Sequence, residues 1–173
     1  RPRTDVYTRL ATQARIGYIL NNYLNLKGLI SIDIFTRDGD HYHVGDTLDV
    51  GQVDTAAVQR LWQSARDSER LVWWAGVERN VNTHSTHGQV ITAAKVLRRM
   101  NRETLTQEPL ALLLANYSVD ELYDRFHRTD LGEDAYIQIV DQRGRVIYHP
   151  DRTLIGSRID APLWHVNAEP EMS

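Results

Sequence analysis

IDIFTRDG (residues 32–39) and IQIVDQRG (residues 137–144) align without a gap, and this pair of segments decides the predicted fold. In both, apolar and polar residues alternate before a glycine, which is typical of a half-buried strand that enters a hairpin turn. Glycine suits such a turn because it reaches positive φ without strain. A short stretch with a tyrosine follows each segment, Tyr42 in the first and Tyr148 in the second. The sequence therefore predicts two modules of one type in series.

The chain around the first segment is predicted to form a mixed α+β module. A helix is expected over residues 6–26, where apolar residues recur at helical spacing, with Gly28 as its C-terminal stop. A second helix is expected after Asp54, a favoured N-cap residue. Strands are expected at residues 29–35, 41–44, 71–77, 89–98 and 110–117, with a polar loop at residues 80–88.

The boundary between the modules is predicted from a capping box. Ser118 is followed three positions later by Glu121, so a helix should begin at Ser118 and run to about His127. We therefore divide the chain into an N-terminal helix (residues 1–28), a first module with its connecting helix (29–130) and a second module (131–173). The second module is too short for a matching sheet, so we expect it to be partial or truncated.

Composition indicates an ordinary globular domain. Hydrophobic residues make up 42% of the chain and charged residues 25%, and the formal net charge is −3. No basic stripe points to nucleic acid. The chain has no cysteine, which excludes disulfides and thiolate chemistry. The longest apolar run, residues 110–115, is far shorter than the roughly 20 residues that cross a bilayer. Because the chain starts at Arg1 rather than methionine, we expect a mature or excised fragment, which could come from a membrane protein.

Catalytic motifs are missing from the sequence, including the nucleophile elbow, the phosphate-binding glycine loop and HExxH. The histidines offer one alternative. His41 and His43 would share a strand face, and His84 and His87 lie in the polar loop, so a metal-dependent hydrolase is conceivable if the two pairs meet. Neither spacing matches a strong ligand motif, so we expect no tightly bound transition metal and no cofactor.

An aromatic segment suggests a ligand pocket. Trp73 and Trp74 are adjacent on a predicted strand, so one should pack in the core and the other should face away from it. A tryptophan wall near an arginine such as Arg70 suits a small molecule with a carboxylate, because the ring excludes water and the guanidinium binds two oxygens. The alternative is that both tryptophans are core residues.

AYIQIVDQRGRVIYHPDRTLIGSRI (residues 135–159) resembles the start of the membrane-proximal module in the double Cache family of extracytoplasmic sensors. The most specific part of the resemblance is the His149-Pro150-Asp151 turn followed by Leu154-Ile155-Gly156. Upstream, the long helix, the IDIFTRDG segment, the tryptophan-bearing strand and LALLLANYSVDELYDRF are similar to the membrane-distal module in the same order.

The resemblance implies a long N-terminal helix packed on tandem PAS-like modules with antiparallel sheets. It also implies a periplasmic or extracellular sensor that lies between two transmembrane helices of a histidine kinase, diguanylate cyclase or chemoreceptor. Such a domain binds a small molecule in its distal module, does no chemistry and passes a conformational change to a cytoplasmic output domain. A non-sensing module that dimerises through its N-terminal helix is the other alternative.

The pocket is expected between the sheet and residues 80–88. Many amino-acid-binding members carry an Arg-x-Trp-Tyr stretch and a later aspartate near the end of the last strand. Here Arg70 lies three residues before Trp73, Trp74 stands where tyrosine is usual, and Asn116 stands near the aspartate position. These departures leave the ligand open. The predicted ligand-binding residues are Arg70, Trp73, Trp74, Arg79, Asn116 and Tyr117. His149 is expected to belong to a structural turn in which Asp151 binds nearby backbone amides.

Overall fold

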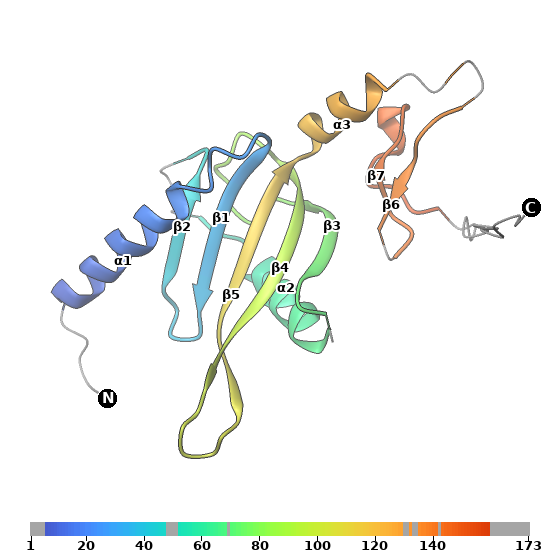
Figure 1. Ribbon diagram of the computed structural model, residues 1–173. Coiled ribbons are helices and arrows are strands. Elements are labelled where there is room, and N and C mark those ends of the chain that lie inside the picture. Colours follow the sequence, from blue (N-terminus) through green and yellow to red (C-terminus); the bar gives the residue numbers. More distant parts are fainter. Residues whose placement is uncertain are drawn as a thin grey trace, which may run out of the picture.

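The computed structural model describes residues 6–47, 52–68, 70–129, 132, 135–141 and 143–159. Its centre is an antiparallel sheet of five strands in the order β2-β1-β5-β4-β3 (Figure 1). The α+β class is confirmed. The strands of this sheet are β1 (Leu29–Thr36), β2 (His41–Gly45), β3 (Trp73–Arg79), β4 (Gln89–Met100) and β5 (Gln107–Ser118).

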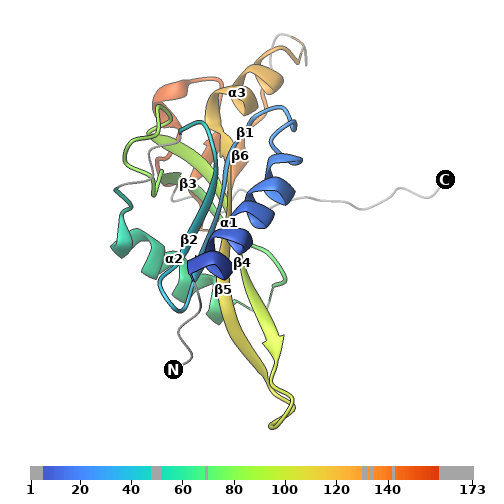
Figure 2. The same cartoon turned by 90° about the vertical axis from the view of Figure 1, so that its left-hand side faces the viewer.

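Helices cover the two faces of the sheet. Figure 2 shows α1 (Val6–Asn21) on one side and α2 (Thr55–Asp67) on the other. Alternation along β1 explains this arrangement, because Ile32 packs with Leu20 of α1 while Phe35 joins a cluster that includes Leu61 of α2. The α2 side holds the larger core, and β5 contributes Leu112 and Leu114 to it.

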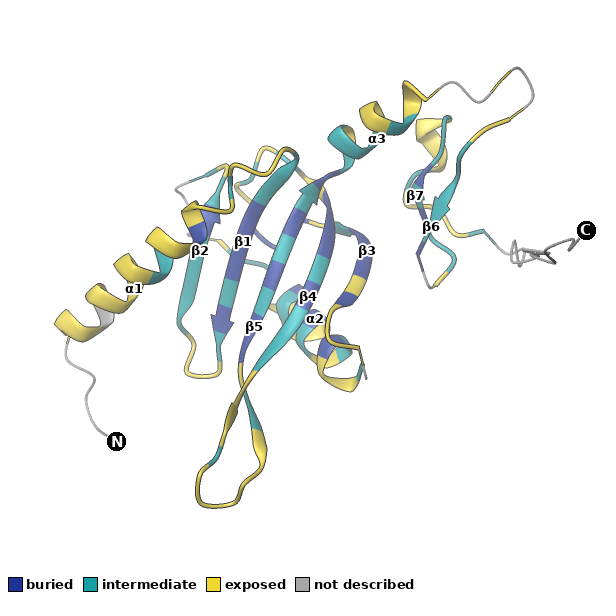
Figure 3. Ribbon diagram, viewed as in Figure 1, coloured by how far each residue is buried: buried dark blue, intermediate teal, exposed yellow. Residues whose placement is uncertain are grey.

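Helix α1 is shorter than predicted. It ends at Asn21, and the backbone N–H groups of Tyr23 and Leu24 bond to carbonyls three residues back, which marks a series of turns. The prediction that Gly28 ends the helix is therefore wrong. Gly28 has a φ of +88°, and a Cβ there would overlap the ring of Tyr117, so the glycine permits close packing against β5. The first half of α1 extends away from the sheet and is exposed (Figure 3).

Both predicted helix caps are confirmed. The carboxylate of Asp54 accepts a hydrogen bond from the backbone N–H of Ala57, at 2.9 Å, and so caps α2. The hydroxyl of Ser118 accepts from the N–H of Glu121, at 3.1 Å, at the start of α3 (Val119–His127). Each bond satisfies one of the N–H groups that a helix leaves unpaired at its first turn.

The two segments that decided the prediction lie in separate sheets, as expected. The second forms a small hairpin of β6 (Ile139–Val140) and β7 (Val146–Tyr148), followed by the 3₁₀ helix η1 (Arg152–Leu154). Within the described residues the second module has no further strands, which agrees with its expected partial character. The predicted turn is also confirmed, because Asp151 accepts from the N–H of Thr153 while its own N–H donates to His149 Nδ1.

No helix in the described part of the chain is both long enough and apolar enough to cross a membrane.

Candidate functional site

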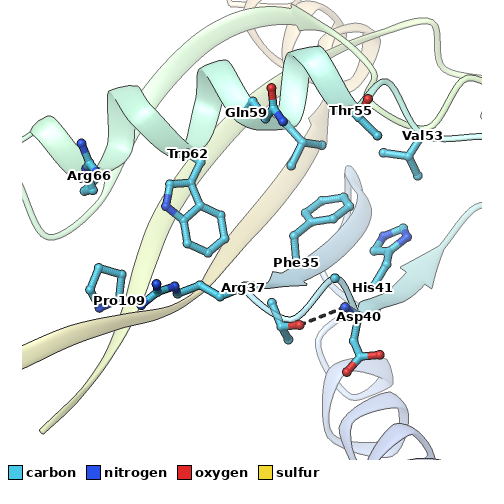
Figure 4. Close-up of a pocket in the computed structure, with 13 residues that line it drawn as sticks. Phe35, Arg37, Asp40, His41, Val53, Thr55, Gln59, Trp62, Arg66 and Pro109 are labelled. Atoms are coloured by element: carbon cyan, nitrogen blue, oxygen red, sulfur yellow. Dashed lines mark hydrogen bonds between the residues drawn. The ribbon is translucent and has the colours of Figure 1, made fainter. Parts of the chain in front are cut away.

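A cavity of about 720 Å³ opens between α2 and the β1–β2 hairpin (Figure 4). It lies on the α2 face of the sheet, and its size falls within the range of small-molecule sites. Residues of the hairpin, of α2 and of the segments beside them line it: Phe35, Thr36, Arg37, Gly39, Asp40, His41, Val53, Thr55, Val58, Gln59, Trp62, Arg66 and Pro109.

The cavity combines aromatic surface with basic groups. The indole of Trp62 projects from α2, and the ring of Phe35 stacks on His41 with centroids 4.3 Å apart. Arg37 enters from the hairpin and Arg66 from the last turn of α2 (Figure 4). Guanidinium groups bind carboxylates through paired hydrogen bonds, and aromatic walls exclude water from such contacts. The cavity is therefore chemically suited to a small anion with an apolar part.

A buried polar cluster lies beside the cavity on the same face of the sheet. The carboxylate of Asp33 has no exposed surface and receives hydrogen bonds from His41 Nε2, at 2.8 Å, and His43 Nδ1, at 2.7 Å, both at Oδ1. Its Oδ2 accepts from Ser31 Oγ, at 3.0 Å, and from Asn116 Nδ2, at 3.3 Å. Four donors thus satisfy a carboxylate that would otherwise be costly to bury.

The charge state of this cluster follows from its hydrogen bonds. Burial would raise the pKa of Asp33, but the hydrogen bonds and charges of His41 and His43 outweigh it and hold the pKa below the usual value. Burial would lower the pKa of His43, but the hydrogen bond and charge of Asp33, aided by the carbonyl of Thr47, raise it. An imidazolium–carboxylate pair of His43 and Asp33 is the consistent description.

The predicted pocket residues Arg70, Trp73, Trp74 and Arg79 do not lie together in the structure. Trp73 is 7% exposed and packs in the core under α2, with the guanidinium of Arg143 5.0 Å from its ring centroid. Trp74 is 52% exposed and lies on the opposite face of β3. Arg70 lines a separate groove with Lys95 and the last residues of β4. Arg79 is exposed and lies at the end of β3, opposite Gln89 of β4 in the strand pairing.

The two predicted residues of β5 also diverge. Asn116 is 1% exposed and joins the buried cluster, where its Oδ1 accepts from Thr92 Oγ1 at 2.8 Å and its Nδ2 donates to Ser31 and Asp33. The hydroxyl of Tyr117 donates to the carbonyl of Lys27, beyond the other face of the sheet. The structure thus places one of the six predicted residues, Asn116, in the cluster beside the cavity. The ligand-binding role of all six stays a prediction.

The histidine pairs are not united. Among the described residues, Asp33, His41 and His43 are the one set of three or more side chains whose ligand atoms converge closely enough that they could hold a metal ion. This set contains neither loop histidine. His87 Nδ1 lies 3.2 Å from Asp46 Oδ2, which also accepts from Ser85 Oγ at 2.6 Å. Asp46 therefore ties residues 80–88 to the end of β2.

Sequence reasoning missed several residues of this face. Arg37, Trp62 and Arg66 come from the hairpin turn and from α2, and their meeting depends on how α2 crosses the sheet. Asn82 was also missed. It is 2% exposed, and its Nδ2 has no hydrogen-bond partner among the described residues. A buried amide donor is normally paired, by protein, water or ligand. The helical spacing of Trp62 after Asp54 was the available signal, but it indicated only the face of α2.

Arg145 joins the second module to the edge of the first sheet. Its guanidinium donates to Asp141 Oδ2 at 2.9 Å, to Glu78 Oε1 at 3.0 Å, and to the backbone carbonyls of Ala75 and Val77. This contact lies at a β-bulge between Trp74 and Gly76 of β3. The second attachment is aromatic. Tyr123 and Phe126 of α3 pack on Tyr148 of β7, and the Tyr123 hydroxyl donates to the carbonyl of Pro150.

The fold is that of Cache-type sensor domains. The ligand-binding domain of the chemoreceptor CtaA of Pseudomonas fluorescens, in complex with L-isoleucine, matches with a TM-score of 0.60 at 16% identity. That of the amino acid chemoreceptor PctB of Pseudomonas aeruginosa matches at 18% identity, with TM-scores of 0.61 and 0.62 for its complexes with L-Gln and L-Arg. At this level of identity the likeness establishes the fold. It confirms the resemblance to double Cache sensors in architecture.

The matches cover 84–88% of this chain but only 53–57% of the solved domains, so the chain spans little more than half of their length. No protein-family model matches the sequence, and no curated protein matches it significantly.

Proposed function

We propose that this chain is the extracytoplasmic sensing domain of a membrane signalling receptor and that it binds a small anionic molecule in the cavity between α2 and the β1–β2 hairpin. The observation that carries the proposal is this cavity of about 720 Å³, with Arg37 and Trp62 in its lining. The fold supports it, because the similar solved domains are receptor domains that bind amino acids. Those ligands carry a carboxylate, which is the group that Arg37 and Arg66 suit.

The proposed mechanism is a population shift rather than catalysis. A ligand that prefers one spacing of α2 and the sheet would favour that spacing. Leu61 and Ala65 of α2 pack in one cluster with Trp73 of β3, and Arg145 connects β3 to the second module. A movement of α2 would therefore reach the second module through β3. The output domain would be a histidine kinase, a diguanylate cyclase or the signalling part of a chemoreceptor.

Thermal-shift screening with amino acids and small organic acids tests the site. We expect a carboxylate ligand to stabilise the wild type, and Arg37→Gln and Arg66→Gln to weaken its binding about tenfold or more, because each removes a charged hydrogen bond. Arg70→Gln is the matched control, since Arg70 lies in a different groove. Loss of binding in Arg70→Gln with full binding in Arg37→Gln would move the site to the predicted tryptophan segment.

Homodimer formation through α1 belongs to the same proposal. Val6, Tyr7 and Leu10 are 69%, 80% and 58% exposed on the part of the helix that extends past the sheet. Burial of such side chains against a second copy would stabilise a dimer. Analytical ultracentrifugation of the wild type and Leu10→Glu tests this idea. A dimer of unchanged affinity in Leu10→Glu would exclude this face.

A further inference from the structure

Asp33, His41 and His43 converge on one point although they come from two strands. The pairing of β1 with β2 sets Asp33 directly opposite His43 and Phe35 directly opposite His41. Because side chains two residues apart share a face, all three groups lie on the α2 side of the sheet. Their ligand atoms, one carboxylate oxygen and two ring nitrogens, lie within 4.8 Å of one another.

The hydrogen-bond pattern around His43 resembles that of a metal-binding histidine. Its Nε2 lies 3.1 Å from the carbonyl of Thr47, which can only accept, so Nε2 carries a proton. Nδ1 faces Asp33 Oδ1, and His41 Nε2 faces the same oxygen. Without an ion, each of these two nitrogens needs a proton to bond an ionised carboxylate. A cation at their meeting point would replace both protons.

The surroundings hold all three groups in place. Ser31 Oγ and Asn116 Nδ2 donate to Asp33 Oδ2 and leave Oδ1 directed at the histidines. The Thr47 carbonyl fixes the tautomer of His43, and stacking on Phe35 orients His41. Protein metal sites use such outer contacts to orient their ligands. His41 also lines the cavity, so further coordination positions would face open space.

We propose that Asp33, His41 and His43 form a binding site for a divalent transition-metal ion, with zinc as the expected ion. Two imidazoles and one carboxylate favour zinc, cobalt, nickel or copper over magnesium and calcium, which prefer all-oxygen sets. Tetrahedral zinc with bonds of about 2.0–2.1 Å places its ligand atoms about 3.3 Å apart. The N–O separations of 2.7 and 2.8 Å must therefore widen by about half an ångström.

This site departs from the expectation of no tightly bound metal. That expectation weighed the spacing of the histidines alone, and Asp33 lies eight residues before His41 on the neighbouring strand. His41 also lines the cavity, but the metal proposal does not rest on the ligand proposed there, because the three groups are directed at one another.

Isothermal titration with zinc chloride tests the site on tag-free protein that has been treated with chelator and dialysed. We expect one zinc ion per chain in the wild type and a loss of at least tenfold in affinity in His41→Gln, His43→Ala and Asp33→Asn. Magnesium and calcium chlorides should not bind. His84→Ala and His87→Ala are the matched controls and should bind zinc like the wild type, because neither residue belongs to the cluster.

Circular dichroism and thermal melting establish which variants are folded. His41→Gln keeps the test decisive even if Asp33→Asn unfolds. We expect His41→Gln to fold, because the side chain of His41 is partly exposed and Asp33 keeps its other donors. No zinc binding by folded wild type would overturn the proposal. Undiminished binding in folded His41→Gln and His43→Ala, or loss of binding in His84→Ala or His87→Ala, would overturn it as well.

Discussion

Single polar side chains at the centre of the sheet hold its buried hydrogen-bond cluster together. Asn116 illustrates this, because it is the point at which β1, β4 and β5 exchange side-chain hydrogen bonds through Ser31, Asp33 and Thr92. Its amide can donate at one end and accept at the other, which no carboxylate can do when ionised. An amide rather than an acid at this position is therefore required by Asp33 next to it.

We predict that Asn116→Asp destabilises the domain by about 2 kcal/mol or more, because it sets a second buried carboxylate against Asp33 and removes a donor. Urea denaturation measures the change in the free energy of unfolding. Asn22→Asp, in an exposed turn, makes the same chemical change and should alter stability by less than about 0.5 kcal/mol. Equal effects of the two substitutions would contradict the role assigned to the cluster.

Gly76 is a second position at which the structure disfavours any side chain. Its φ is +78°, and a Cβ would overlap Asp141 Oδ2 of the second module. We predict that Gly76→Ala costs more than the roughly 1–2 kcal/mol of left-handed strain, because it also pushes Asp141 away. Gly39→Ala is the matched control, since φ is +90° there and a Cβ would meet open space. Thermal denaturation of both variants should show the larger loss for Gly76→Ala.

Much of this residue-level detail could be predicted from the sequence when it depended on neighbours along the chain. Ser118 and Asp54 cap helices because their partners are three residues away. The direction of Trp73 could not be predicted, since a bulge between Trp74 and Gly76 shifts the pairing of β3 with β4. Asp33 was missed for a related reason. Its role depends on its pairing with His43 across two strands, whereas the histidine spacing was considered only within one strand.

At the scale of elements, the loop of residues 80–88 is attached to the end of β2. Asp46 follows β2 and accepts hydrogen bonds from Ser85, Thr86 and His87, so it fixes residues 80–88 against the sheet. Apart from the end of α1, the strands and helices themselves were predicted to within a few residues, because alternation and capping are local signals. The cavity between α2 and the β1–β2 hairpin was not predicted, since the crossing of α2 over the hairpin is a tertiary feature.

We predict that Asp46→Asn lowers the free energy of unfolding by about 1 kcal/mol near neutral pH, because an amide oxygen is a weaker acceptor. Burial would raise the pKa of Asp46, but hydrogen bonds from Ser85 and His87 outweigh it and lower the pKa from 3.8. The contribution is therefore complete above 3.8 and is lost as pH falls through the lower folded value. The difference between wild type and variant should therefore shrink as the pH falls below 3.8 in urea titrations. A difference that grows on acidification would contradict it.

At the scale of the whole molecule, two attachments unite the modules. One is the aromatic contact of α3 with β7, and the other is the Arg145 contact with the bulge of β3. The repeat in the sequence predicted two modules but not their contact, because Arg145 precedes β7 in sequence and bonds a strand almost 70 residues earlier.

We predict that Arg145→Ala weakens the attachment by about 1.5–3 kcal/mol, since it removes charged hydrogen bonds and leaves buried Asp141 without its cation. Hydrogen exchange of β7 and β3 should accelerate, while exchange in β1 and β5 stays unchanged. Arg158→Ala, which removes the same charge from an exposed site after η1 that meets Arg145 in an isolated β-bridge, is the control. Equal protection of β7 in both variants would show that the aromatic contact alone holds the module.

The bulge of β3 has one more consequence, which concerns behaviour at high concentration. β3 is an edge strand, and edge strands can pair with strands of other molecules and so start aggregation. The Arg145 guanidinium occupies the carbonyls of Ala75 and Val77, which are acceptors that an incoming strand would need. A bulge also twists the edge away from straight pairing. The β6–β7 hairpin, through Arg145, thus shields the β3 edge of the sheet from intermolecular pairing.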